Sequence, residues 1–275
     1  MRETWVEADR EEFLLEGPGA MGRGRMRLRT KTIRSGDYLE CEIYPLVPAE
    51  AGTRAKRRER SPESIRRANE RAAVKSLERL MNCNFGPGDM LVHLTCADCC
   101  PFEEMRRRVR NWLRRVKTRY ERAGAECAYV YVIETTGSGD RERHHLHAVL
   151  RRGPLTRDDL ETLWGNGLAR VDRCVRQEKG LAGFANYIVQ KKETQTRLMK
   201  RRWGCSKGLK RPAVTVSDTK FSRAAAQRIA EAAEMDAREE FEKRYPGYRL
   251  VEQPLVRRSD WMPGAYIYAF MERRR

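Results

Sequence analysis

The sequence predicts an α+β protein, and two observations carry that prediction. Short apolar runs rich in β-forming residues, such as 90–95 and 127–133, alternate with segments whose apolar residues recur at helical spacing. In addition, residues 127–150 read as strand, turn and strand, which is typical of a β-hairpin with a long loop. A chain of 275 residues is long enough for about two domains and for a core that needs no disulfide or metal.

The first predicted elements follow one another from residue 90 onward. Residues 90–95 (MLVHLT) form a strand, and Pro101 then opens a helix, because proline fits the first helical turn. One side of this helix is apolar and the other is mostly arginine. The runs 127–133 and 144–150 are the two strands of the hairpin, joined by the turn 135–143. The apolar positions of the helix are Met105, Val109, Trp112, Leu113, Val116 and Tyr120.

Five further elements are expected after the hairpin. Thr156 caps a short helix, which has acidic residues in its favourable first turn. Residues 168–175 form a strand, and a helix covers 180–192. A long helix over 221–244 precedes an alternating strand at 265–270 (AYIYAF).

The chain therefore divides into three parts. Residues 1–75 are expected to form a basic, partly flexible N-terminal extension, because Gly and Pro recur there and a basic run (RAKRRER) spans 54–60. Residues 76–215 form the packed α+β unit. Residues 216–275 supply a C-terminal helix plus a strand, packed on that unit or extending it.

Charge and composition narrow the classes of partner. The chain carries 57 Lys and Arg against 39 Asp and Glu, a net charge of +18, so a polyanion, most commonly a nucleic acid, is the expected partner. The longest apolar run has seven residues, whereas a membrane span needs about 20. Eight scattered cysteines and an N-terminus without an apolar signal core point to a reduced, cytoplasmic compartment. The sequence contains no GxxxxGK, so no attached ATPase is expected.

Three of the four histidines fall within residues 144–147. On a strand, His145 and His147 point to the same face and can bind one divalent metal ion together, although such a pair can also be exposed and inert. Glu134 ends the preceding strand and falls across the hairpin from them; Glu142 is a competing carboxylate. Two histidines and one carboxylate suit Mg²⁺ or Mn²⁺, and the alternative for Glu134 is a surface charge at a strand end.

A tyrosine and a lysine share one face of the predicted helix 180–192. Tyr187 and Lys191 are four residues apart, so they lie one above the other on that helix. A tyrosine hydroxyl is a poor nucleophile unless a cation or metal assists it, and a lysine one turn away supplies such a cation. The alternative is that the tyrosine borders the core and the lysine is a solvated charge.

Two basic segments are candidates for binding nucleic acid. The predicted arginine-rich helix contributes Arg106, Arg107 and Arg110. Residues 191–211 hold nine Lys or Arg and one acid, and they interleave basic residues with an aromatic, which suits single strands unless the segment is only a solvated loop. The residues selected there are Arg201, Arg202, Trp203, Lys207 and Lys210.

A group of cysteines follows the first predicted strand. His93 precedes Cys96 by three residues, and Cys99 and Cys100 come shortly after. This is half of a zinc pattern, and no second CxxC follows at the spacing of a zinc finger. We therefore interpret these cysteines as small buried residues near a strand end.

Taken together, the motifs resemble the HUH endonuclease superfamily, in particular the rolling-circle replication initiators of small phages and plasmids. VHLTCAD (92–98) resembles the first motif of that superfamily, and His145-Leu146-His147 is similar to its His-hydrophobic-His pair. The run 187–191 (YIVQK) is similar to the third motif, a tyrosine with a lysine four residues on. The trailing WGCSKGLKRP is similar to a basic segment that often follows this tyrosine in bacterial members.

The resemblance implies a fold and a reaction. It implies a central antiparallel β-sheet with flanking helices, with the metal-binding histidines on a middle strand. Residues 76–215 would then be a nicking and joining endonuclease domain of the single-tyrosine type, in which His145, His147 and Glu134 hold Mg²⁺ or Mn²⁺. Tyr187 would attack DNA, leaving a 5′-phosphotyrosine link and a free 3′-OH, with Lys191 assisting. The implied partners are single-stranded DNA or an origin hairpin, and a separate helicase and polymerase of a bacterial host.

Three other interpretations remain open at this point. A relaxase or a small transposase would use the same chemistry in another role, although relaxases often place the tyrosine near the N-terminus, before the histidines. A non-catalytic, basic nucleic-acid-binding protein would leave the histidines without a role. A metal-dependent nuclease that uses water would cut DNA without covalent attachment.

Overall fold

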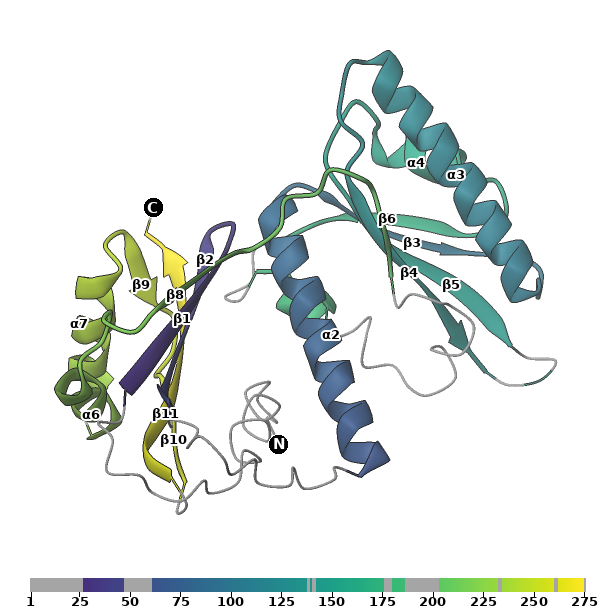
Figure 1. Ribbon diagram of the computed structural model, residues 1–275. Helices are drawn as coiled ribbons and strands as arrows, with labels where there is room; N and C mark the ends of the chain where they lie inside the picture. The colour runs from purple at the N-terminus through teal and green to yellow at the C-terminus, as the bar shows by residue number, and fades with distance from the viewer. Residues whose placement is uncertain are drawn as a thin grey trace. The chain divides into compact units, whose positions relative to one another are not determined.

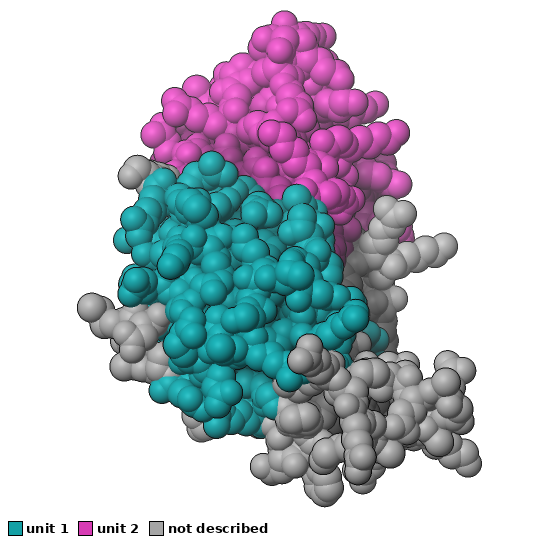
Figure 2. Space-filling view, turned by 60° about the vertical axis from the view of Figure 1, so that its left-hand side comes forward, with its two compact units in different colours: residues 1–72, 212–275 teal, residues 73–211 magenta. Residues whose placement is uncertain are grey.

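The computed structural model describes residues 27–46, 61–137, 139, 142–175, 180–185, 203–231, 234–259 and 262–274. The chain splits into two compact units, which Figure 2 colours separately. One unit combines the two ends of the chain, Met1–Ala72 and Pro212–Arg275, and the other is the continuous stretch Ala73–Arg211. No helix in the described part of the chain is long and apolar enough to cross a membrane.

The continuous unit is built on a five-stranded antiparallel sheet (Figure 1). Its strand order is β6-β3-β5-β4-β7, so β5 is the middle strand. The α+β fold class with antiparallel sheets and flanking helices is therefore confirmed. The strands are β3 (Met90–Thr95), β4 (Tyr129–Thr136), β5 (Arg143–Leu150), β6 (Ala169–Arg173) and β7 (Gly204–Cys205).

Helix α3 (Phe102–Arg122) covers one face of this sheet (Figure 1). All six apolar positions expected from its spacing are buried, because that stripe faces the strands. They pack against alternate strand residues such as Val92, Leu94 and Leu146. Trp112 is fully buried and donates its indole N–H to the carbonyl of Leu160, at 3.2 Å.

Two further helices complete the continuous unit. Helix α4 (Arg157–Thr162) starts at Thr156, whose side chain and that of Asp159 cap each other's backbone N–H groups, as the sequence predicts. Helix α2 (Pro62–Asn84) begins in the other unit and ends in this one. Near its end, Asn82 accepts a hydrogen bond from the backbone of Leu181 at 3.0 Å.

The other unit is a six-stranded sheet with two helices (Figure 1). Its order is β10-β11-β2-β1-β8, and β9 also pairs with β11. Helices α6 (Arg223–Glu231) and α7 (Glu234–Arg244) pack on one face. The strands are β1 (Arg27–Ser35), β2 (Tyr38–Leu46), β8 (Ala213–Ser217), β9 (Tyr248–Leu250), β10 (Leu255–Ser259) and β11 (Met262–Arg273).

Two sequence predictions for this unit have different outcomes. The alternating strand at 265–270 is confirmed, since it lies within β11. The single long helix over 221–244 is wrong, because α6 and α7 are separate helices that pack on each other. Arg228 Nε lies 3.1 Å from Glu240 Oε1, whereas residues twelve apart on one straight helix are about 18 Å apart. Folding back brings Ile229 and Phe241 into one core.

Gly167 is packed against the backbone at the end of β3, which yields a first prediction. A Cβ at this position would lie 2.4 Å from the backbone N of Ala97, and the residue has φ +149°. Because a backbone atom cannot move aside cheaply, Gly167→Ala is expected to lower the free energy of unfolding by about 1–3 kcal/mol. Urea unfolding followed by circular dichroism measures this change.

Gly86→Ala is the matched control, since a Cβ at Gly86 meets nothing within 4 Å. The close packing at the end of β3 would be contradicted if the two variants unfolded at the same urea concentration.

Candidate metal and nucleic-acid site

The register of three strands places histidines side by side on one face of the five-stranded sheet. In the β3–β5 pairing, His93 lies directly opposite His147, and Thr95 lies opposite His145. In the β4–β5 pairing, Glu134 lies opposite His145. Because side chains alternate along a strand, all of these point away from the face that α3 covers.

The side chains of His93, His145, His147 and Glu134 form what we call the histidine cluster. The rings of His93 and His147 are stacked, with centroids 4.5 Å apart and planes at 9°. The ring of His93 also lies 5.5 Å from that of His145. His93 therefore belongs with the His145-x-His147 pair, whereas the sequence pattern grouped it with the cysteines.

Glu134 is a buried carboxylate next to one of these rings. Its Oε2 lies 2.8 Å from Nε2 of His147, and its side chain is only 5% exposed. His145 forms a hydrogen bond through Nε2 to the hydroxyl of Thr136, at 3.0 Å. The other ring nitrogen of His145, Nδ1, is buried and has no hydrogen-bond partner among the described residues.

The electrostatics of the cluster favour neutral imidazoles. Burial, together with the nearby His147 and His145, lowers the pKa of His93 to about 4. Burial also lowers the pKa of His145, and His147 adds to this effect. A neutral imidazole keeps a lone pair for a metal ion, so His93 and His145 are in the protonation state that a metal ligand requires.

The donor set of the cluster fits a divalent metal ion. Two adjacent ligand atoms of an octahedral ion with bonds of about 2.1 Å are about 3 Å apart, close to the 2.8 Å between His147 and Glu134. The unpartnered Nδ1 of His145 is the kind of buried polar atom that a bound ion would satisfy. As placed, these side chains do not bring three ligand atoms within 4.8 Å of one another, so closing on an ion requires side-chain rotation.

His144 lies on the opposite face of the same strand. Its Nδ1 forms a 2.9 Å hydrogen bond with the hydroxyl of Thr135, and its ring meets the ring of Phe102 edge-on, with centroids 5.4 Å apart. This face belongs to the core under α3. His144 is therefore a core residue, separate from the histidine cluster.

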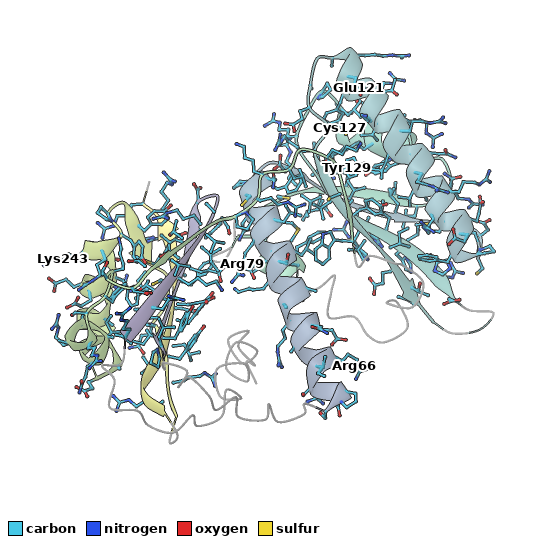
Figure 3. All side chains as sticks on the ribbon, viewed as in Figure 1. Arg66, Arg79, Glu121, Cys127, Tyr129 and Lys243 are labelled. Carbon is cyan, nitrogen blue, oxygen red and sulfur yellow. The ribbon has the colours of Figure 1, made fainter. Side chains whose placement is uncertain are left out.

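The arginine-rich side of α3 lies across the sheet from the cluster. Figure 3 shows the side chains of α3 extending away from the strands. Arg106 and Arg107 are tied to Glu103 and Glu104, at 2.9 and 2.7 Å. Arg110 is exposed and has no ion pair in the described residues. The structure thus brings the histidines and Glu134 together and leaves the basic helix on the opposite face.

The second basic segment is described only in its last part. Trp203 is half-buried just before β7, and Lys207 and Lys210 are exposed. The backbone of Lys210 exchanges two hydrogen bonds with the side-chain amide of Asn84, each 2.8 Å long. The remaining predicted site residues, Tyr187, Lys191, Arg201 and Arg202, lie outside the described residues.

The fold and the site define a class of unit: an antiparallel sheet with a histidine and carboxylate cluster on one face and a basic amphipathic helix on the other. Residues 89–193 match a family of replication-associated proteins of the ORF2 type. The matched stretch is less than half of the chain; it includes β3, β4 and β5, and also Tyr187 and Lys191. No curated protein and no solved structure matches the chain.

The environment of His93 yields a second prediction. We expect His93 to titrate near pH 4, well below the ordinary histidine value of 6.5, because burial and two neighbouring imidazoles disfavour its charged form. The unfolded chain would protonate this ring near pH 6.5, so His93 makes the folded state less stable as the pH falls from 6.5 towards 4. A ¹⁵N NMR titration of the metal-free protein measures the pKa.

The chain has four histidines, so His93→Gln assigns the signal by removing it. A midpoint for His93 near 6.5 would mean that the three rings do not share a desolvated site.

Proposed function

We propose that this protein initiates rolling-circle DNA replication by nicking single-stranded DNA and later rejoining it. The observation that carries the proposal is the histidine cluster, which brings His145, His147 and Glu134 onto one face within a stretch that matches a replication-associated family. The same matched stretch contains Tyr187 and Lys191 at the spacing expected of a nucleophile and its assisting cation.

The metal ligands in this proposal are His145, His147 and Glu134, with His93 beside them. Three imidazoles in the cluster favour Mn²⁺ over Mg²⁺, because Mg²⁺ prefers oxygen ligands throughout. Such an ion, when bound, polarises the scissile phosphate and offsets the charge that builds on its oxygens. The burial of Glu134 keeps water away from this charge, so the attraction is stronger than it would be at the surface.

The proposed nucleophile is the hydroxyl oxygen of Tyr187. It attacks the phosphorus in line, the P–O3′ bond breaks, and the 3′ oxygen leaves as a free 3′-OH that primes synthesis. Lys191 stabilises the tyrosinate and holds a phosphate oxygen. The phosphotyrosine bond keeps the energy of the phosphodiester, so a 3′-OH can reverse the reaction without ATP.

The described residues on both sides of this tyrosine support its place in the unit. Leu181 is bonded to Asn82, and Lys210 is bonded to Asn84, so the chain enters and leaves the stretch 182–209 at the end of the same helix, α2. The backbone of Ser206 also pairs with Tyr129 on β4, at 3.0 Å. The segment that carries Tyr187 and Lys191 is thus fastened at both ends to the unit that carries the histidine cluster.

Binding of DNA in this proposal uses the basic side chains of two segments. Arg106, Arg107 and Arg110 lie on α3, and Trp203, Lys207 and Lys210 lie near β7 with Arg201 and Arg202 just before them in the sequence. Because α3 and the histidine cluster lie on opposite faces of the sheet, α3 would hold DNA flanking the nick site. The protein would act in the cytoplasm of a bacterial host, with a separate helicase and polymerase.

The third prediction tests the nucleophile. Incubation with Mn²⁺ and labelled single-stranded oligonucleotides from the protein's own replicon is expected to give a protein–DNA band that resists SDS. Tyr187→Phe should abolish the band, because it removes the attacking oxygen, and EDTA or His147→Ala should do the same. Tyr44→Phe is the matched control: it removes a tyrosine hydroxyl from the other unit and should leave the band intact.

Two results would count against this mechanism. Cleavage without an adduct that persists in Tyr187→Phe would identify a nuclease that uses water. DNA binding with no cleavage at any site of the replicon, whatever the metal, would leave a binding protein.

The fourth prediction concerns α3. Arg110 is the basic side chain in the predicted set on α3 without an ion pair in the described residues, so it is free to neutralise a DNA phosphate. Arg110→Ala should reduce the slope of log K against log salt for single-stranded DNA by about 0.7. Fluorescence anisotropy at several salt concentrations measures the slope.

Lys117→Ala is the control on the same helix, since Lys117 is already 3.3 Å from Glu121 and should change the slope less. Equal slopes for Arg110→Ala and the parent protein would show that this face of α3 does not contact DNA.

A further inference from the structure

A second group of metal-binding side chains lies at the end of β3, apart from the histidine cluster. The sulfur atoms of Cys96 and Cys100 and a carboxylate oxygen of Asp98 lie within 4.8 Å of one another. Among the described residues, this is the set of three ligand atoms from His, Cys, Asp or Glu that comes so close together. Both cysteines are buried, as the sequence suggested, but Asp98 joins them in place of His93.

The spacing of these atoms is near that of a zinc site. With Zn–S bonds of about 2.3 Å in a tetrahedral site, two sulfur ligands lie about 3.8 Å apart, so the three atoms need to move by about 1 Å or less. The separation Cys96-x₃-Cys100 also falls within the usual spacing of paired zinc ligands. Thiolates are soft ligands that select Zn²⁺ over Mg²⁺ and Mn²⁺.

The carboxylate of Asp98 is held in place by an arginine. Arg108 donates from its two terminal nitrogens to the two oxygens of Asp98, at 2.6 and 3.0 Å. This pairing lowers the pKa of the Asp98 carboxyl, so the group is ionised and oriented. Ligating carboxylates in metal sites are commonly fixed by such an outer partner.

The charges around a bound ion would balance. Two thiolates and one carboxylate carry three negative charges, which one Zn²⁺ and the Arg108 guanidinium offset together. Burial and the neighbouring Cys96 thiol raise the pKa of Cys100 to about 12, so without a metal this thiol stays protonated and inert. Binding of the ion would release its proton.

We propose that Cys96, Asp98 and Cys100 bind one Zn²⁺ at the junction of β3 and α3, with water in the fourth position. The site ties down the strand end that follows His93. The same junction is already fastened by the backbone bonds Thr95 N to Leu168 O, at 2.8 Å, and Ala97 N to Asn166 O, at 2.9 Å. The proposed ion is structural, and its binding is independent of the nicking reaction.

The test uses Co²⁺ as a spectroscopic probe in the full chain. The parent for this experiment carries His145→Ala and His147→Ala, which removes the histidine cluster as a competing site. After reduction, Co²⁺ titration should give the near-ultraviolet charge-transfer band that requires thiolate ligands, saturating at one ion per chain. Zn²⁺ should displace Co²⁺ and abolish the band, and it should raise the thermal unfolding temperature.

Three substitutions in this parent locate the site. Cys100→Ser should abolish the band, and Asp98→Asn should weaken Co²⁺ binding at least about tenfold. Asp98 is exposed, so Asp98→Asn tests the site without disturbing the core. Cys205→Ser, which changes an exposed cysteine of the same unit, should leave the band and the affinity unchanged.

Several outcomes would overturn the zinc site. The absence of a thiolate band in well-folded, reduced protein would do so, as would a band that survives Cys100→Ser. A Cys96–Cys100 disulfide detected by mass spectrometry in protein purified without reductant, with no Co²⁺ band after reduction, would replace the metal site with a redox pair. None of these results depends on whether the protein nicks DNA.

Discussion

The pairing register of β3, β5 and β4 controls both faces of the five-stranded sheet. Side chains along a strand alternate, so one register places Val92, Leu94 and Leu146 under α3 and places His93, His145 and Glu134 on the reverse face. A slip of one residue would exchange the two sets, burying imidazoles under the helix and exposing the apolar core. The apolar packing of α3 therefore fixes the geometry of the histidine cluster, although the helix never touches it.

The histidine cluster opposes stability in the absence of a ligand. A buried carboxylate and several desolvated imidazoles are costly groups to remove from water, and burial lowers the pKa of both His93 and His145. The close contact between Glu134 and His147 offsets part of that cost. A site of this kind is typical of binding or catalysis, because a purely structural sheet would fill the same positions with apolar side chains.

Local pairing reduces the effect of the large positive charge. The first turns of α3 carry Glu103 and Glu104, which favour the helix N-terminus and also pair with Arg106, Arg107 and Arg108. Asp98, before the helix, takes up Arg108 as well. The net charge of +18 therefore overstates the cations free to meet DNA on this helix. Nucleic-acid binding depends on the unpaired minority, of which Arg110 is the example on α3.

Local sequence patterns were enough to predict most elements of the continuous unit. The strands at 90–95 and 144–150, the apolar stripe of α3 and the cap at Thr156 follow from periodicity and from backbone hydrogen-bonding rules. Which of these residues meet depends on the folded chain. His93 and His147 are 54 positions apart in the chain, and strand register brings their rings together; no local spacing records this. For the same reason the sequence did not predict the sheet that joins residues 27–46 to the C-terminal strands, or the fold-back between α6 and α7: both bury apolar surface between distant segments, and neither has a local turn signal.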